Sequence, residues 1–363
     1  MKRIKSIDIL RGLSMTWMVI GHLLAWWIRG KDRWVYLLTF EILDPIGAAA
    51  FLLVAGISTA ISYRTRLAKI EITEGYTKNN VRNEYMLRAF FIFIVAILFN
   101  LFIAIAISDP EMIWTWFILL TIAISLFIAW PLLETPKLFR IFLGALFWIL
   151  HLLLLDFLSL FKGEPNLYGV LYHILYNIPR LDPILPMFPF FLFGTILGEI
   201  LHDIYLRENH SDIKLKLKKK FLRPLIILGP VLIICGILYD FPAIPRNRSF
   251  IWLIYSLGIQ LTILSIFVFF EEFVFYKVEK SYKFLFYYSY YSLVIYLTHN
   301  PLYFLFYRQL NMFEIWIFIA VTFIIIGLIF RFIYKRWGYK ASLKTQIGRL
   351  ASGIAKKIEE KKV

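Results

Sequence analysis

Apolar residues gather along the chain in blocks of about 20, and short polar or charged segments separate the blocks. A helix of that length crosses the ~30 Å hydrocarbon core of a bilayer, because each residue adds about 1.5 Å of rise. The blocks cover residues 9–28, 41–63, 89–107, 113–134, 138–161, 184–204, 224–240, 251–271, 285–306 and 314–334. We therefore expect an all-α membrane protein with about ten transmembrane helices.

The composition supports this class of protein. Of the 363 residues, 60% are hydrophobic and 18% are charged, whereas about 25% charged residues is usual in soluble domains. This balance excludes a soluble enzyme, a disordered chain and a secreted disulfide scaffold. The single cysteine, Cys235, lies in an apolar block, so the sequence offers neither a disulfide framework nor a thiolate metal site.

The distribution of charge predicts the orientation in the membrane. The net charge is +16. With the N-terminus inside, 29 of the 40 lysines and arginines fall in cytoplasmic segments and eight in outer segments. The reverse topology would contradict the positive-inside rule. We expect both termini to be cytoplasmic and the protein to be a multi-pass component of a cell membrane, in a prokaryote the plasma membrane.

Two basic runs, 214–220 and the tail from Lys335, raise the alternative of nucleic-acid binding. We expect instead no nucleic-acid partner, since such runs anchor topology and contact lipid headgroups. In the tail, apolar residues recur at helical spacing among lysines, as in a helix lying on the inner membrane face. We therefore divide the chain into one transmembrane domain, 1–335, and a basic amphipathic cytoplasmic tail, 336–363.

Ionisable side chains inside the apolar blocks are functional candidates, because they are costly in hydrocarbon unless they are paired or line a wet cavity. Arg11 and His22 lie 11 residues apart in the first block, which places them on one helix face about 16 Å apart along the axis. An arginine suits phosphate and a buried imidazole suits proton transfer. The alternative is that Arg11 reaches the interface and His22 bonds a neighbouring carbonyl.

Two further polar residues lie in the outer half of the predicted helices. Asp44 precedes Pro45 in the second block, where it either orients His22 or caps a helix. His299 stands beside Asn300 and Pro301 in the ninth block, and Pro301 is expected to bend the helix around a cavity. His22, Asp44 and His299 form the predicted catalytic group.

Basic residues near the inner ends of three blocks form the predicted donor-binding group. Arg64 and Arg66 end the second block, and Arg88 opens the third with Asn100 three turns deeper. With Arg11 they would make a basic mouth for an anionic nucleotide, although topology anchoring explains Arg64 and Arg66 equally well. The blocks hold no His-x-x-x-His or Glu-x-x-His pair, so we expect no metal.

Several segments resemble integral-membrane acyltransferases, both the acyltransferase-3 group and the heparan-α-glucosaminide N-acetyltransferase-like group. Residues 6–22 resemble the first helix of these enzymes, with ten residues between an arginine and a histidine. The second and third resemble residues 44–66 and 88–100. Later helices with a Pro…Gly…Gly pattern and with a histidine resemble residues 185–198 and 292–304.

The resemblance implies an enzyme that takes an acyl group, most often acetyl, from cytosolic acyl-CoA. It would pass the group to a hydroxyl or amine of a sugar-like acceptor at the far membrane face. His22 would act as general base with Asp44 fixing its tautomer, or as the carrier in an acyl-histidine relay. Glucosaminide enzymes place their histidine in a loop beyond the first helix, and residues 29–40 here contain none.

A proton-coupled transporter of a small solute is the alternative function. Buried histidine and aspartate and the helix-breaking Pro301 suit such a carrier. The concentration of polar residues in one helix at a spacing comparable to a pantetheine arm favours the acyltransferase. We expect membrane lipids, acyl-CoA and the acceptor as partners, and the sequence leaves open whether the protein is a homodimer.

Overall fold

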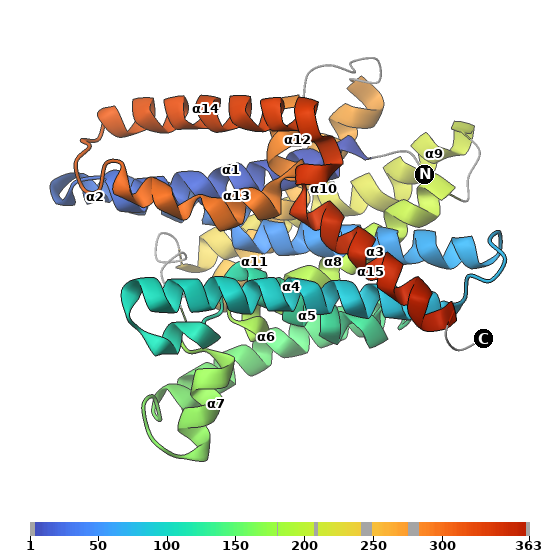
Figure 1. The fold of residues 1–363 in the computed structure, drawn as a ribbon, viewed down its shortest axis with the longest axis horizontal. Helices are drawn as coiled ribbons and strands as arrows, with labels where there is room; N and C mark the ends of the chain where they lie inside the picture. The colour runs from blue at the N-terminus through green and yellow to red at the C-terminus, as the bar shows by residue number, and fades with distance from the viewer. Residues whose placement is uncertain (1–3, 180, 207–209, 241–248, 275–282, 361–363) are drawn as a thin grey trace.

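The computed structural model describes residues 4–179, 181–206, 210–240, 249–274 and 283–360. These residues form a bundle of helices without a named β-strand, and most of the long helices run along one direction (Figure 1). Nine segments of the described chain are long and apolar enough to cross a membrane. The protein is thus an all-α, multi-pass membrane protein, as the apolar blocks predict.

The α-helices have the following bounds: α1 Lys5–Trp27, α2 Arg33–Leu43, α3 Ala48–Ile70, α4 Lys78–Ile107, α5 Ile118–Ala129, α6 Lys137–Ser159, α7 Leu167–Leu175, α8 Ile184–Leu206, α9 His210–Lys216, α10 Arg223–Asp240, α11 Phe250–Phe269, α12 Lys283–Tyr290, α13 Ser292–Thr298, α14 Glu314–Trp337 and α15 Leu343–Glu360. Three short 3₁₀ segments matter below: η2 Asp44–Ile46, η3 Pro110–Trp114 and η7 Asn300–Phe304. The helix α1 begins at one end of the bundle, and α15 ends at that same end (Figure 1).

The prediction of one continuous helix over 285–306 is wrong. That stretch is divided into α12, α13 and η7, with breaks at Tyr291 and His299. Pro301 supplies the physical reason for the second break, since it has no N–H for a helical hydrogen bond and disfavours helical backbone in the preceding residue. The count of continuous spans in the described chain is therefore nine rather than ten.

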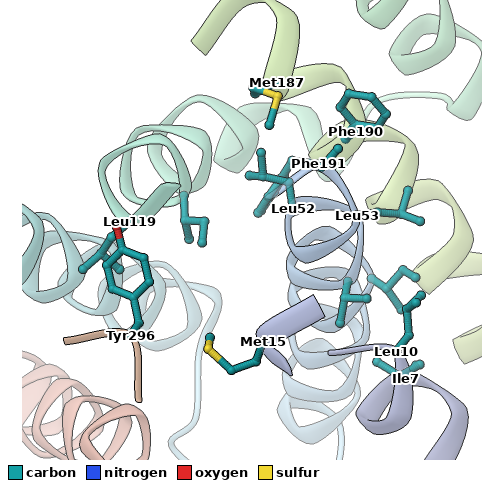
Figure 2. Packing of buried hydrophobic residues seen from close by; sticks show 14 of the residues in the cluster. Ile7, Leu10, Met15, Leu52, Leu53, Leu119, Met187, Phe190, Phe191 and Tyr296 are labelled. Carbon is teal, nitrogen blue, oxygen red and sulfur yellow. The ribbon is translucent and has the colours of Figure 1, made fainter. Parts of the chain in front are cut away.

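Close contact between α3 and α8 forms the middle of the bundle. A Cβ atom on Gly56 would overlap the carbonyl oxygen of Phe191, and one on Gly194 would overlap that of Leu53. Glycine therefore lets the two backbones approach, as the small residues of the second block predict. Figure 2 shows Phe190 and Phe191 of α8 beside Leu52 and Leu53 of α3 in the apolar core.

The far end of α1 is fastened to the segment after η7. The carbonyl oxygens of Trp26 and Trp27 accept hydrogen bonds from the N–H groups of Arg308 and Leu310, at 2.9 and 3.0 Å. The indole N–H of Trp27 donates to the Leu302 carbonyl oxygen at 2.7 Å. These bonds satisfy carbonyls that a helix end leaves open, and they hold η7 against the last turn of α1.

The basic tail forms α15, an amphipathic helix that packs against α4. Its buried residues are Ile347, Ala351 and Ala355. The Asn83 amide of α4 donates to the Glu359 carboxylate at 2.7 Å near the end of the tail helix. Figure 1 shows α15 crossing obliquely over the bundle. Whether the tail also lies on a membrane face stays a prediction.

Candidate functional site

A cavity of about 1910 Å³ runs through the bundle beside α1. Its lining extends along that helix from Ile4 to Trp26, which is ~33 Å of rise and close to the thickness of the hydrocarbon core. The remaining walls come from α3, α4, α5 and the α13–η7 break, with α2 and the first turn of α15 at the two ends. The cavity therefore connects the region where α1 begins with the region where it ends.

At one end the lining is strongly basic, and we call this the basic end: Arg11, Arg66, Arg88 and Lys344. Arg11 donates to the Ser58 hydroxyl, and its guanidinium lies 3.5 Å from the Asp8 carboxylate. Arg66 pairs with Glu84 at 3.2 Å. The positions of Arg11 and Arg66 are thus fixed by neighbours from three helices.

Arg88 differs from the other two arginines. Its strongest charged neighbours are Arg66 and Arg11, which carry the same sign. Among the described residues, no carboxylate lies within 4 Å of its guanidinium. Like charges gathered in a partly dehydrated cavity repel one another, and an anionic ligand relieves that repulsion.

Two residues predicted for donor binding lie outside the cavity lining. Arg64 pairs with Glu199 at 2.8 Å, beside Arg140 on the same carboxylate. Arg64 precedes Arg66 by two residues, so its side chain lies ~200° around α3 from that of Arg66 and on nearly the opposite face of the helix. Asn100 donates to the carbonyl oxygen of Thr115 at 2.8 Å and so ties α4 to the segment after η3.

At the other end two imidazoles meet, and we call this the histidine end: His22 of α1 and His299 at the α13–η7 break. Their ring centroids are 4.9 Å apart, in an edge-to-face arrangement. The Trp26 ring stacks on His299 at 5.8 Å and meets His22 edge-on at 5.0 Å. The structure thus brings together two of the three predicted catalytic residues, and both face the cavity.

The helix break fixes the tautomer of His299. The last carbonyls of a helix have no helical partner, and the Tyr296 carbonyl in the last turn of α13 lies 2.7 Å from His299 Nδ1. A carbonyl oxygen only accepts hydrogen bonds, so Nδ1 carries the proton. His299 Nε2 is then an acceptor; it is buried and has no hydrogen-bond partner among the described residues. Such a nitrogen can remove a proton from a ligand.

Asp44 lies in the same cavity, at the start of a short helical turn. It is buried and begins η2, where its backbone carbonyl accepts from the Gly47 N–H at 2.8 Å. Its part in catalysis stays a prediction.

Sequence reasoning did not select several residues that line the cavity. From the sequence, Trp26 is typical of an interfacial aromatic, Asp182 lies in a loop, Tyr303 lies in the ninth apolar block and Lys344 lies in the tail. Tyr36 of α2 also lines it, and burial raises the pKa of its hydroxyl, which therefore stays a neutral donor. Only the fold places these residues beside the helices that carry the histidines and arginines.

One protein family matches most of the chain. The family described as heparan-alpha-glucosaminide N-acetyltransferase, catalytic, matches residues 3–236. No curated protein matches the chain. The matched region contains Arg11, His22, Arg66 and Arg88, whereas His299 and the tail helix lie beyond it.

Proposed function

The chain belongs to the heparan-α-glucosaminide N-acetyltransferase catalytic family, and from this premise we propose that it transfers acetyl groups across a membrane. The donor is acetyl-CoA, or another acyl-CoA, that enters from the cytoplasm at the basic end. The acceptor is an amine or hydroxyl of a sugar-like molecule at the histidine end. The observation that carries the proposal is one cavity with cations at one end and two imidazoles at the other.

The basic end suits the nucleotide part of the donor. Coenzyme A carries three phosphate groups on its nucleotide, and guanidinium groups bind phosphate oxygens through paired hydrogen bonds. Arg88, with only like charges as its strongest neighbours, is the group most favoured to bind a phosphate. Arg11 and Arg66 would share the remaining negative charge. The positive-inside rule places this end in the cytoplasm, where acyl-CoA is found.

The spacing along α1 suits the rest of the donor. Arg11 and His22 lie on one face of a continuous helix, about 16 Å apart along its axis. That length is comparable to a pantetheine arm. A donor held by its phosphates at Arg11 would therefore present its thioester close to His22.

His299 is the proposed general base at the histidine end. Its Nε2 takes a proton from the acceptor amine or hydroxyl as the acceptor attacks the thioester carbonyl. A new C–N or C–O bond forms, the C–S bond breaks, and the coenzyme A thiolate leaves. His22 lies beside the departing sulfur and relays to it the proton that His299 took up: it accepts that proton at one ring nitrogen and gives one to the thiolate, so both imidazoles end neutral. In a relay variant of this scheme, His22 first accepts the acetyl group.

Release of free thiol from acetyl-CoA tests the proposal. We expect the purified protein to release coenzyme A in the presence of an amino-sugar acceptor, and His22→Ala to lose that activity. His173→Ala is the matched control, since His173 lies in α7, away from this cavity. Movement of a solute without thiol release would instead establish the transporter.

Thermal stabilisation separates donor binding from chemistry. Ligand that binds the native state raises the unfolding midpoint by mass action. Coenzyme A should stabilise the wild type and His22→Ala at the same concentrations, whereas Arg88→Ala should need about 10- to 100-fold more. A folded wild type that no acyl-CoA stabilises would contradict the proposed donor site.

A further inference from the structure

The cavity reaches the protein surface through an apolar rim. Apart from His22, its exposed lining residues are all apolar and belong to α2, the last turns of α4, and η7: Leu37, Phe102, Ala106, Ile107, Pro301 and Phe304. The side chains of Phe102 and Phe304 are 62% and 80% exposed. In contrast, the lining residues at the basic end are buried or half-buried. We call this rim the lateral opening.

The lateral opening is continuous with a surface that faces lipid. On α4, Leu98, Phe102 and Ile105 follow one another at helical spacing and are all strongly exposed. Because α4 is a candidate membrane span, an exposed apolar stripe on it is expected to contact hydrocarbon. Phe102 belongs to this stripe and to the cavity lining at once. The cavity therefore opens into the bilayer at this point.

The helix α2 forms the other side of the lateral opening. Its residues Trp34, Leu38 and Ile42 are about half exposed and repeat every four positions, so they share one outward face. Tyr36 and Phe40, on another face, line the cavity. A helix that shows apolar residues outward and aromatic residues to a cavity separates lipid from the site, as an interfacial helix does.

We propose that the acceptor is an amphiphile, a sugar-like head that carries the reactive amine or hydroxyl on a hydrocarbon chain that stays in the bilayer. The head would reach His22 and His299, where Trp26, Asp182 and Asn300 also line the cavity. The chain would leave between α4, α2 and η7. This inference rests on the proposed function and names the substrate class of the same site.

The apolar rim disfavours a free sugar as acceptor. A water-soluble sugar would have to strip its hydroxyl groups of water to pass Phe102 and Phe304 without new hydrogen bonds, and each unsatisfied group costs free energy. A hydrocarbon chain at the same position replaces lipid contacts with similar ones. The opening thus selects for a molecule that is polar at one end and apolar at the other.

Two matched acceptors and two matched variants test the proposal in nanodiscs. Dodecyl β-glucosaminide and methyl β-glucosaminide share a head and differ in the chain. Ala106→Trp narrows the lateral opening, whereas Ile105→Trp places the same indole side chain on the lipid-facing side of α4, outside the lining. Each variant is compared with the wild type on each acceptor, so that partitioning of the amphiphile into the bilayer cancels.

We expect Ala106→Trp to lower the rate of transfer to the dodecyl acceptor at least tenfold relative to the wild type. A tenfold change corresponds to about 1.4 kcal/mol of activation free energy. The rate of transfer to the methyl acceptor should stay within about twofold of the wild-type rate. That limit corresponds to ~0.4 kcal/mol, which is the size of effect that a surface substitution usually has. Ile105→Trp should change neither. An equal loss of rate on both acceptors, or no loss on either, would overturn the proposal that the acceptor chain passes through the lateral opening. The transferase activity would still be established by that result.

A photo-crosslink decides the case in which neither acceptor is acetylated. With p-benzoylphenylalanine at position 106 or at 105, the adduct mass shows where the dodecyl chain lies without any need for turnover. An adduct at 106 that exceeds the one at 105 supports the path even if the proposed transfer fails. Equal or absent adducts at both positions contradict it.

Discussion

The two histidines of the cavity are held in different ways. His299 has its Nδ1 proton fixed by the Tyr296 carbonyl, whereas His22 is placed by ring contacts with Trp26 and His299. A hydrogen bond sets a tautomer and a ring contact does not. For this reason we propose His299 as the base, although His22 is the residue that the sequence favours.

Replacing His299 should separate chemistry from donor binding. We expect His299→Ala to lower kcat for coenzyme A release by about 10²–10⁴, the usual contribution of a positioned general base. The KM for acetyl-CoA should change little, because the basic end is untouched. Steady-state thiol release measures both, and a His299→Ala variant with the wild-type kcat would remove His299 from the mechanism.

Arg88 should act on donor affinity alone. Arg88→Ala removes a charge-assisted hydrogen bond to phosphate, worth about 1.5–3 kcal/mol, so KM for acetyl-CoA should rise about 10- to 100-fold. Arg88→Lys keeps the charge but not the paired geometry and should lie between the two. Arg331→Ala, an exposed arginine of α14 outside the cavity, is the control. A rise in KM that is equal in Arg331→Ala would point to a general charge effect.

At the scale of elements, the sequence predicts the long helices but not their interruptions. Nine of the ten apolar blocks correspond in order to the nine candidate spans, because length and hydropathy decide whether a helix can cross a bilayer. The remaining block contains Pro301, which indicates a bend but not its extent. The helix α2 was read as a loop, since its 11 residues are too few to span.

Site residues follow the same division. Arg11 and His22 share a continuous helix, so their alignment is readable from spacing. The contact of His22 with His299 depends on how α1 packs against the α13–η7 break. The position of Arg64 outside the cavity depends on which face of α3 packs against α8. Such relations are set by packing between elements distant in sequence, and a single sequence carries no signal for them.

The glycine contact of α3 with α8 predicts a large effect on folding. Gly56→Ala would place a methyl group against the Phe191 backbone, and a rigid backbone cannot yield as a flexible side chain does. We expect a loss of about 1–3 kcal/mol, the usual cost of overpacking, and a lower thermal midpoint. Gly348→Ala is the control, since its new Cβ meets nothing within 4 Å. A Gly56→Ala midpoint equal to that of the control would contradict this packing.

For the molecule as a whole, the tail helix completes the basic end from outside the matched family region. Lys344, in the first turn of α15, lines the cavity, whereas Lys340 in the turn before it does not. We expect Lys344→Ala to weaken coenzyme A binding about three- to tenfold, for a half-exposed charge worth about 1 kcal/mol. The loss should shrink at high salt. Titration of the thermal midpoint with coenzyme A measures it, and Lys340→Ala should match the wild type.

The length of the cavity has a consequence for the membrane itself. A passage that follows α1 from Ile4 to Trp26 leaves little hydrocarbon to insulate one compartment from the other. Ions and protons would leak through it whenever it held only water. The donor proposed to fill the passage would therefore also seal it, and the edge-to-face contact of Trp26 with Tyr303 would narrow it once the donor had gone.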